Sequence, residues 1–363
     1  MLGTQENRIL IKVLQANIHR SKVADALLAQ IVIERRIDLV LISEQYRKKE
    51  SGTWIDDNTT TAAIWVPRGS KTQVTNSGKG NGYVYAKCNG VTVMSCYLTP
   101  SDDMQTFLNK LEAIEDKILQ LDGSFIVGGD FNFRAIEWGM GTTNSRGRRV
   151  LEMAARLDLI VANTGTTPTF RREGCQGTIP DITLTSERIA SKLNQWRVLE
   201  DYTGSDHQYL SYCIQTETIS GNDRSTRGTH KWKVAKLKTR SLLEAIDAAL
   251  PTHIANAEEG VRHTMTRITQ ACAIAMPKIT QKKGKKGAYW WTEEISQLRK
   301  ACLLTRRRYT RARRNGTSEA EGREYIQAKK NLKKAINTSK RRKWKELRND
   351  INHDPWGLGY MKK

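Results

Sequence analysis

The sequence predicts an α/β domain followed by a mostly helical, strongly basic C-terminal region. Two observations predict the α/β class. Short runs rich in β-branched residues alternate with amphipathic stretches, and a strand, a helix and a second strand follow one another near the N-terminus. A third observation marks the helical region, which carries nearly all of the net charge of +22. With 363 residues, the chain is long enough for two domains.

The α/β part is organised around residues 124–132, Ser-Phe-Ile-Val-Gly-Gly-Asp-Phe-Asn. Three apolar residues predict a short buried strand, and the glycine pair gives the backbone freedom where that strand ends. Asp130 and Asn132 are two residues apart, so an extended backbone would point both side chains to one side. An ordinary turn is the alternative for this stretch alone, because Asp, Asn and Gly are common turn residues.

Other strands of the chain end in the same way, which favours a shared site over a turn. Residues 8–16 form a predicted strand ending at Asn17, Ser21 caps a helix that runs to about residue 36, and a strand over 38–43 stops at Glu44. We expect further strands at 61–66, 83–87, 91–98, 160–163, 179–184, 195–200 and 208–214, and helices at 103–121 and 145–157.

The charge is divided unevenly along the chain. Residues 1–214 hold 25 Lys and Arg against 24 Asp and Glu, whereas the remaining 149 residues hold 35 against 14. A near-neutral module joined to a part that meets polyanions is one interpretation, and helices that merely face water are the other. We predict domains at 1–214 and 231–363 with a polar linker at 215–230, and helices near 237–250, 254–276, 290–314 and 318–351.

Composition also limits the class of protein. No apolar run has the length of a membrane span, and residues 1–10 lack the pattern of a signal peptide, so we expect an intracellular protein without a membrane partner. The six cysteines form no CxxC pair and have no histidine at zinc-ligand spacing. This pattern favours free thiols over a disulfide framework or a zinc site.

The polar residues at the ends of the strands form an ordered set, although each alone is ordinary. They are Asn17, Glu44, Tyr97, Asp130, Asn132, Asp181, Asp206 and His207. With these residues the sequence resembles the endonuclease/exonuclease/phosphatase superfamily, and more closely the apurinic-endonuclease-like domain that opens the second reading frame of non-LTR retrotransposons. The matching pieces are Leu14-Gln-Ala-Asn17, Leu41-Ile-Ser-Glu44, Cys96-Tyr-Leu-Thr-Pro100, Gly128-Gly-Asp-Phe-Asn132, Thr167-Pro-Thr-Phe170, Pro180-Asp-Ile-Thr-Leu184 and Ser205-Asp-His207.

The resemblance implies a four-layer α/β sandwich with a catalytic cleft at one edge, and a DNA endonuclease that nicks a target strand to leave a 3′-hydroxyl primer. It implies Mg²⁺ as cofactor, with Mn²⁺ as an alternative, because hard oxygen ligands suit such cations. The implied roles are as follows: Glu44 binds the metal with Asn17, Asp130 activates water, Asn132 holds water or phosphate, Asp181 holds a cationic His207, Asp206 lies next to metal and phosphate, and Tyr97 donates to the phosphate.

The basic region has a weaker resemblance, to the connector that precedes the reverse transcriptase in such elements. It rests on Tyr289-Trp-Trp-Thr-Glu-Glu, Arg306-Arg-Arg-Tyr309 and Asp354-Pro-Trp-Gly357. No Tyr-x-Asp-Asp motif is present, so we expect the front part of a longer polyprotein whose reverse transcriptase is missing from this chain. Such a product would meet DNA and element RNA and need access to the nucleus. The expected nucleic-acid contacts are Arg306, Arg307, Arg308, Lys340, Arg341, Arg342 and Lys343.

Several alternatives stay open at this point. A phosphatase or lipid phosphodiesterase of the same superfamily would use much the same residues, and a decayed copy would only bind nucleic acid. His19 stands where better-known repair enzymes of the superfamily carry an acidic residue, which puts the number of metal ions in doubt. Trp290 and Trp291 could stack on unpaired bases, but Ile295 and Leu298 follow at helical spacing and favour a place in the core.

Overall fold

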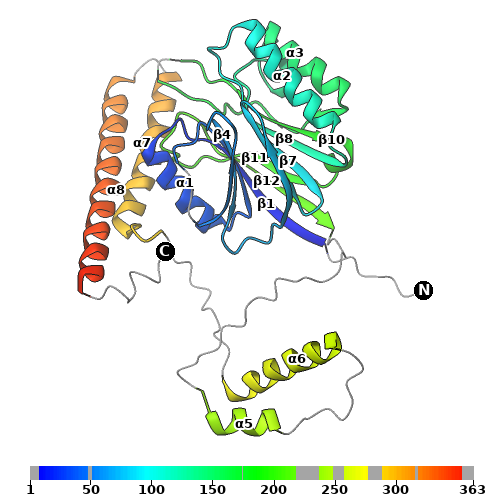
Figure 1. Ribbon diagram of the computed structural model, residues 1–363. Helices are drawn as coiled ribbons and strands as arrows, with labels where there is room; N and C mark the ends of the chain where they lie inside the picture. Colours follow the sequence, from blue (N-terminus) through cyan, green and yellow to red (C-terminus); the bar gives the residue numbers. More distant parts are fainter. Residues whose placement is uncertain are drawn as a thin grey trace. The chain divides into compact units, whose positions relative to one another are not determined.

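The structure is a computed structural model that describes residues 8–47, 51–173, 175–217, 237–247, 257–276, 288–314 and 318–353. The chain forms two compact units, which are described separately. The first joins Met1–Ile219 with Lys285–Lys363, and the second is Ser220–Gly284. The first unit holds both sheets and the long helices α7 and α8 (Figure 1).

Two six-stranded sheets form the centre of the first unit. The order of the first sheet is β11 (Leu193–Val198), β12 (Leu210–Glu217), β1 (Arg8–Asn17), β2 (Leu39–Ser43), β4 (Ala62–Pro67) and β3 (Gly52–Asp56). The order of the second is β5 (Val74–Lys79), β6 (Tyr83–Cys88), β7 (Val91–Tyr97), β8 (Ser124–Asp130), β10 (Asp181–Ser186) and β9 (Leu159–Val161). Each sheet contains one parallel pair, β1 with β2 and β7 with β8.

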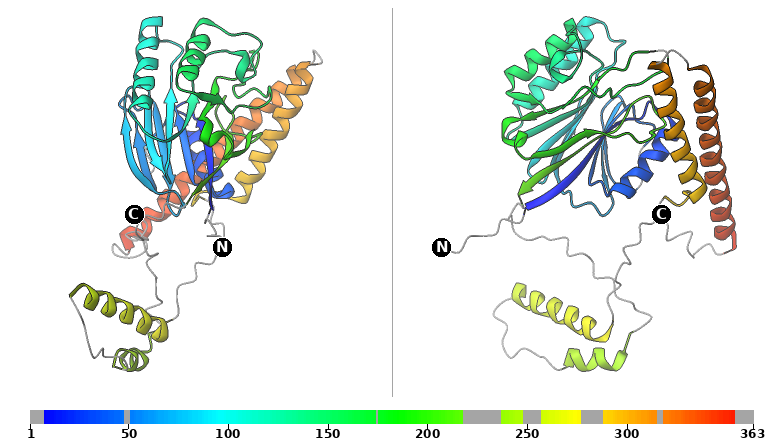
Figure 2. Two further views of the ribbon diagram at one scale, coloured as in Figure 1. Left: turned by 90° about the vertical axis from the view of Figure 1, so that its right-hand side faces the viewer. Right: turned by 180° about the vertical axis from the view of Figure 1, so that it is seen from behind.

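The sheets pack face to face, and helices cover their outer faces. Along β1, Ile11 and Val13 enter the core between the sheets, whereas Leu14 and Ala16 pack under α1 (Lys22–Arg35). This period of two buries both faces of the strand, which explains its nearly continuous apolar sequence. α2 (Met104–Leu119) and α3 (Ser145–Arg156) cover the second sheet (Figures 1 and 2). The predicted four-layer α/β sandwich is therefore confirmed.

Most predicted elements lie within a few residues of their expected positions. Ser21 caps α1, where its side chain accepts a hydrogen bond from the Ala24 amide, and Asp103 caps α2 in the same way. β12 extends to Glu217, three residues beyond the expected domain boundary. Two edge strands, β3 and β5, and the short helices at Ile136–Trp138 and Glu187–Ala190 (α4) were not predicted. The sequence of β5, Val-Thr-Asn-Ser-Gly-Lys, has no alternation of apolar residues because its side chains are mostly exposed.

Two basic helices form a further layer on α1. α7 (Glu293–Arg314) and α8 (Glu319–His353) lie side by side, and both contribute to one apolar cluster with the outward side of α1 (Figures 1 and 2). Trp290 is 3% exposed in this cluster, which supports the core interpretation of that tryptophan. Trp291 packs edge to face against it at 5.6 Å.

The second unit contains α5 (Thr239–Asp247) and α6 (Ala257–Ala275). The Lys238 amide donates to the Ala275 carbonyl at 3.0 Å, and the Arg267 side chain donates to the Ile246 carbonyl at 3.0 Å, so the two helices are tied to each other. None of the helices in the described ranges is long and apolar enough to cross a membrane. The cysteines are free thiols, as predicted.

Candidate active site

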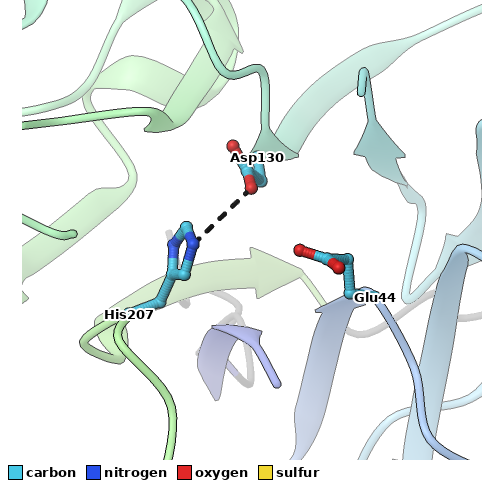
Figure 3. Close-up of side chains that lie close together, drawn as sticks. All are labelled: Glu44, Asp130 and His207. Atoms are coloured by element: carbon cyan, nitrogen blue, oxygen red, sulfur yellow. Dashed lines mark ion pairs between the residues drawn. The ribbon is translucent and has the colours of Figure 1, made fainter. Parts of the chain in front are cut away.

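The predicted site residues come together because strand ends of both sheets meet at one edge. In the second sheet, Tyr97 of β7 and Asp181 of β10 both stand in register with Asp130 of β8. In the first sheet, Asn17 at the end of β1 is paired with Ser43 at the end of β2, just before Glu44. Figure 3 shows Glu44, Asp130 and His207 pointing toward one another.

The backbone is strained where it presents these groups. Glu44 and Asn132 have left-handed backbone φ values of 48° and 58°, which are uncommon for residues other than glycine. Gly129 has φ 154°, and a Cβ there would lie 1.9 Å from the Cys96 carbonyl oxygen. The second glycine of the pair is therefore required for β8 to approach β7 closely just before Asp130. Strain of this kind is typical of functional sites.

Asn17 connects the two acidic residues. Its Nδ2 donates to Glu44 Oε1 at 3.0 Å and to Asp130 Oδ2 at 2.7 Å, and its Oδ1 accepts from the His19 amide at 2.8 Å. The amide therefore offers its donors to the carboxylates, which keeps two buried negative groups close together. Its expected role as a metal ligand stays a prediction.

His207 is held by Asp181 in the interior. His207 Nδ1 lies 2.8 Å from Asp181 Oδ2, which also accepts a hydrogen bond from Thr169 Oγ1 at 2.7 Å. The Phe170 ring packs edge to face on the imidazole, with centroids 4.9 Å apart. The other ring nitrogen, Nε2, lies 3.8 Å from Asp130 Oδ2 (Figure 3). Asp181 therefore fixes which nitrogen faces the site.

Burial and charge shift the protonation of these groups. Burial lowers the pKa of His207 by itself, but the charge and hydrogen bond of Asp181 outweigh it and raise the pKa to about 9. Burial raises the pKa of Asp130 to about 7, against the opposite effect of the nearby His207. Burial and the Glu44 carboxylate raise the pKa of Tyr97 to about 12. At neutral pH the site thus contains an imidazolium, a phenol and a carboxyl group near its titration point.

The arrangement fits a divalent cation. One ligand atom each from Glu44, Asp130 and His207 lie within 4.8 Å of one another. Within this group the carboxylates of Glu44 and Asp130 are the oxygen donors. Hard oxygen donors of this kind suit Mg²⁺, Mn²⁺ and similar ions. His19 Nδ1 lies 3.5 Å from Glu44 Oε1, where the expected repair-enzyme pattern has an acidic residue.

Two predicted site residues make contacts that differ from their expected roles. Asp206 pairs with Arg172 at 3.0 Å at the surface and is outside the cluster of Glu44, Asp130 and His207. Asn132 donates through its side chain to the Leu98 carbonyl at 3.1 Å and through its backbone to Asp130 Oδ1 at 3.0 Å. Asn132 thereby orients the Asp130 carboxylate.

The expected nucleic-acid contacts divide into exposed and buried residues. Arg307, Arg308, Arg341 and Arg342 are exposed, and Lys340 and Lys343 are half-buried. Arg306 departs from the expected nucleic-acid contact. It is 8% exposed and donates to Gln208 Oε1 at 3.0 Å and to the Glu200 carbonyl at 2.9 Å. Its guanidinium is occupied by these two partners, so we do not assign it a nucleic-acid contact.

Supporting residues were missed in the sequence. Ser43 Oγ donates to the Cys96 carbonyl at 3.0 Å and accepts from the Asp130 amide at 3.2 Å, so it joins the two sheets under the site. Gln15 is buried between the sheets and donates to the carbonyls of Gly129 and Ile182 at 3.2 and 3.0 Å. The signal for Gln15 was a polar residue within an apolar strand. Thr169 lies in the motif Thr167-Pro-Thr-Phe170, but the sequence did not indicate its hydrogen bond to Asp181.

The comparisons with known proteins agree with this geometry. Residues 91–211 match the model of a family described as endonuclease-reverse transcriptase. The fold is similar to that of the endonuclease domain of TRAS1, a telomere-specific non-LTR retrotransposon, with 28% identity over 56% of this chain and 98% of that one and a TM-score of 0.51. The sheets of the first unit therefore have the fold of an apurinic-endonuclease-like domain. We refer to it below as the nuclease domain.

Other solved structures resemble the chain more distantly. An AP endonuclease from Archaeoglobus fulgidus is 13% identical over 56% of this chain and 99% of that one, with a TM-score of 0.46. A 3′ phosphatase from Neisseria bound to a product DNA hairpin is 15% identical over 56% and 98%, also with a TM-score of 0.46. Among curated proteins, no sequence matches this chain. The family match over residues 91–211 and the likeness to the TRAS1 domain, and not these distant structures, indicate a hydrolytic enzyme of the endonuclease/exonuclease/phosphatase type.

Proposed function

We propose that the chain is a Mg²⁺-dependent DNA endonuclease that nicks a target strand and leaves a 3′-hydroxyl as primer for reverse transcription. The observation that carries the proposal is the buried pair of His207 and Asp181 opposite Asp130 and Glu44, which Asn17 joins. Its support is that the nuclease domain is similar to the endonuclease domain of a non-LTR retrotransposon.

The reaction assigns a task to each polar group. Asp130, with its pKa near 7, accepts a proton from the attacking water, which then bonds to phosphorus. The bond from phosphorus to the 3′ oxygen breaks, and this oxygen takes a proton from solvent water, so that a 3′-hydroxyl and a 5′-phosphate remain. The imidazolium of His207 and the phenol of Tyr97 donate to the phosphate oxygens as negative charge develops there. Glu44 would hold the cation, with Asn17 and Asp130 beside it, and the bound cation would neutralise phosphate charge.

The surface next to the site favours a nucleic-acid substrate. Arg171, whose backbone amide donates to the Asp206 carbonyl at 2.8 Å, pairs with Glu200 at 3.0 Å. These two residues border a hollow of about 290 Å³, and α7 forms its other wall with Arg306, Arg307, Thr310 and Arg311. Apart from the internally bonded Arg306, this hollow thus offers Arg171, Arg307 and Arg311 next to the segment that carries His207. A duplex phosphate backbone suits such a surface.

The test is nicking of supercoiled plasmid in Mg²⁺, with and without excess chelator, followed by extension of the ends with a DNA polymerase. Open-circular plasmid that can be extended without prior phosphatase treatment is the expected product. Mn²⁺ should substitute for Mg²⁺ after the chelator is removed. Intact plasmid in both metals, together with hydrolysis of a simple phosphomonoester, would instead support a phosphatase.

Two wider parts of the proposal concern the cell. An enzyme that primes reverse transcription on chromosomal DNA needs access to the nucleus and to element RNA. The basic helices α7 and α8 are the surface that we assign to such polyanions. A reverse transcriptase that uses the primer would have to be supplied by a further domain or a separate protein.

A further inference from the structure

The basic helices α7 and α8 are bound to the nuclease domain by a specific interface. Its apolar part joins Leu27 of α1 and Tyr202 to Trp290, Cys302 and Leu332, and every one of these side chains is buried. Burying such residues stabilises an interface by about 25 cal/mol per Å² of apolar area. The hairpin of α7 and α8 is therefore a packed layer of the unit.

Charged contacts surround this apolar cluster. Arg299 of α7 is 8% exposed and donates to Glu34 Oε2 at 3.1 Å and to Asp201 Oδ1 at 3.3 Å. The Ala288 amide donates to the Gln30 side chain at 2.8 Å. Hydrogen bonds to buried or half-buried partners fix the register of α7 on the domain.

Arg306 lies about two turns after Arg299 along α7 and reaches the segment that carries His207. Its guanidinium donates to Gln208 Oε1 at 3.0 Å, to the Glu200 carbonyl at 2.9 Å and to Glu200 Oε2 at 3.5 Å. Glu200 and Gln208 lie near the two ends of the connection between β11 and β12, and His207 is next to Gln208. The buried Arg306 side chain thus holds the connection that carries His207 near both of its ends.

A short path of contacts leads from Arg306 to the catalytic pair. The Gln208 amide donates to the Thr169 carbonyl at 2.7 Å, and Thr169 Oγ1 donates to Asp181 Oδ2 at 2.7 Å. Asp181 Oδ2 is the atom that holds His207 Nδ1 at 2.8 Å. Asp181 Oδ2 is thereby held by both Thr169 and His207. Gln208 is connected to each of them, to Thr169 by a hydrogen bond and to His207 by the peptide bond.

We propose that Arg306 is a positioning residue for His207, which makes α7 an integral part of the nuclease. The inference rests on the proposed function of the same site. Without the guanidinium, the Gln208 side chain and the Glu200 carbonyl would lose their hydrogen-bond donor. The connection between β11 and β12 would then shift until these acceptors found another donor. Small displacements of a catalytic group cost rate without a change in substrate contacts.

The kinetic test compares full-length variants in the nicking of a duplex oligonucleotide. R306Q should lower kcat by roughly 10- to 100-fold and leave KM nearly unchanged. R306K, which keeps one donor and the charge, should recover part of the rate, and Q208A should lower kcat to a similar extent as R306Q. The double variant R306Q/Q208A should be no slower than either single variant, because the two residues act as a unit. R148Q removes one charge at an exposed position of α3, outside the basic helices, and should behave as the wild type.

A second measurement does not depend on activity. The proton between His207 Nδ1 and Asp181 should give a downfield NMR resonance that is absent in H207Q. R306Q should shift or broaden this resonance, and R148Q should leave it in place. Wild-type kcat in both R306Q and Q208A, with an unchanged resonance in R306Q, would show that Arg306 only packs the helix. An inactive wild type with a resonance that responds to R306Q would instead overturn the proposed reaction and keep the positioning role.

Discussion

His207 and Asp181 form a buried ion pair in which Nδ1 lies 2.8 Å from Oδ2, with the two side chains 5% and 4% exposed. Asp181 is the first residue of β10 and is in register with Asp130 of β8. One pair of antiparallel strands therefore presents the group that orients the imidazole next to the group that faces its other nitrogen. Because the pair is shielded from water, its charge interaction is strong.

The first prediction concerns this pair. D181N should preserve the fold but lower kcat by about 100-fold or more, the scale on which a positioned acid or base contributes. H207A should lose a similar amount, and D181N/H207A should be scarcely slower than either single variant. Single-turnover nicking of a duplex oligonucleotide measures all three, with circular dichroism to verify folding. Losses that multiply in the double variant would show that the two residues act separately.

The second prediction concerns the metal and Glu44. E44Q keeps the shape of the side chain and an oxygen that can accept from Asn17, but removes the charge that attracts a cation. It should lower the nicking rate by about 100-fold, as expected when a charge-stabilising group is removed, and raise the Mg²⁺ concentration needed for half of the maximal rate. E112Q, an exposed carboxylate on α2, is the matched control. Undiminished nicking of the wild type in excess chelator would contradict the metal requirement.

The centre of the site could be predicted from the sequence because its polar residues lie at the ends of apolar strands. Asp130 follows a glycine pair, Glu44 follows an apolar strand, and parallel neighbours within each sheet bring such ends to one edge. The order of the motifs then identified the family of the fold. These signals are local, so they could be read without knowing which strands pair.

The packing of the C-terminal helices could not be predicted. Leu27 and Leu28 are consecutive apolar residues of α1, yet Leu28 packs on the first sheet and Leu27 on α7 and α8. Periodicity shows that a face is buried but not what covers it. Arg306 looked like part of a basic cluster for the same reason, since its partners Glu200 and Gln208 are about a hundred residues earlier in the sequence.

A third prediction follows from the protonation of His207. Its pKa is raised from 6.5 to about 9 in the fold, so the unfolded chain loses this proton first as pH rises. The stabilising contribution of the imidazolium is fully present below about pH 6.5 and disappears as pH passes about 9. H207Q should therefore be less stable than the wild type at pH 6, and the difference should shrink by pH 9.5. Urea unfolding in chelator measures it, and a difference that is independent of pH would contradict a buried cation.

The last prediction separates a nucleic-acid surface from a merely solvated one. Arg307 and Arg308 are exposed on α7 and Arg341 and Arg342 on α8, whereas Arg306 is used internally. In chelator, R307Q/R308Q and R341Q/R342Q should each weaken duplex binding by the full-length chain. Each should also reduce the slope of log affinity against log salt by about 0.9 for every DNA phosphate that the variant no longer neutralises.

The matched control for that experiment is R148Q/R149Q, which removes the same charge from exposed positions of α3 on the outer face of the second sheet. It should leave both affinity and slope nearly unchanged, because only charges near the bound phosphates release counterions. Equal effects of the three double variants would mean that net charge alone sets the affinity. No effect of any of them would place DNA binding in the cleft of Asp130 and His207, and α7 would then serve the nuclease through Arg306 alone.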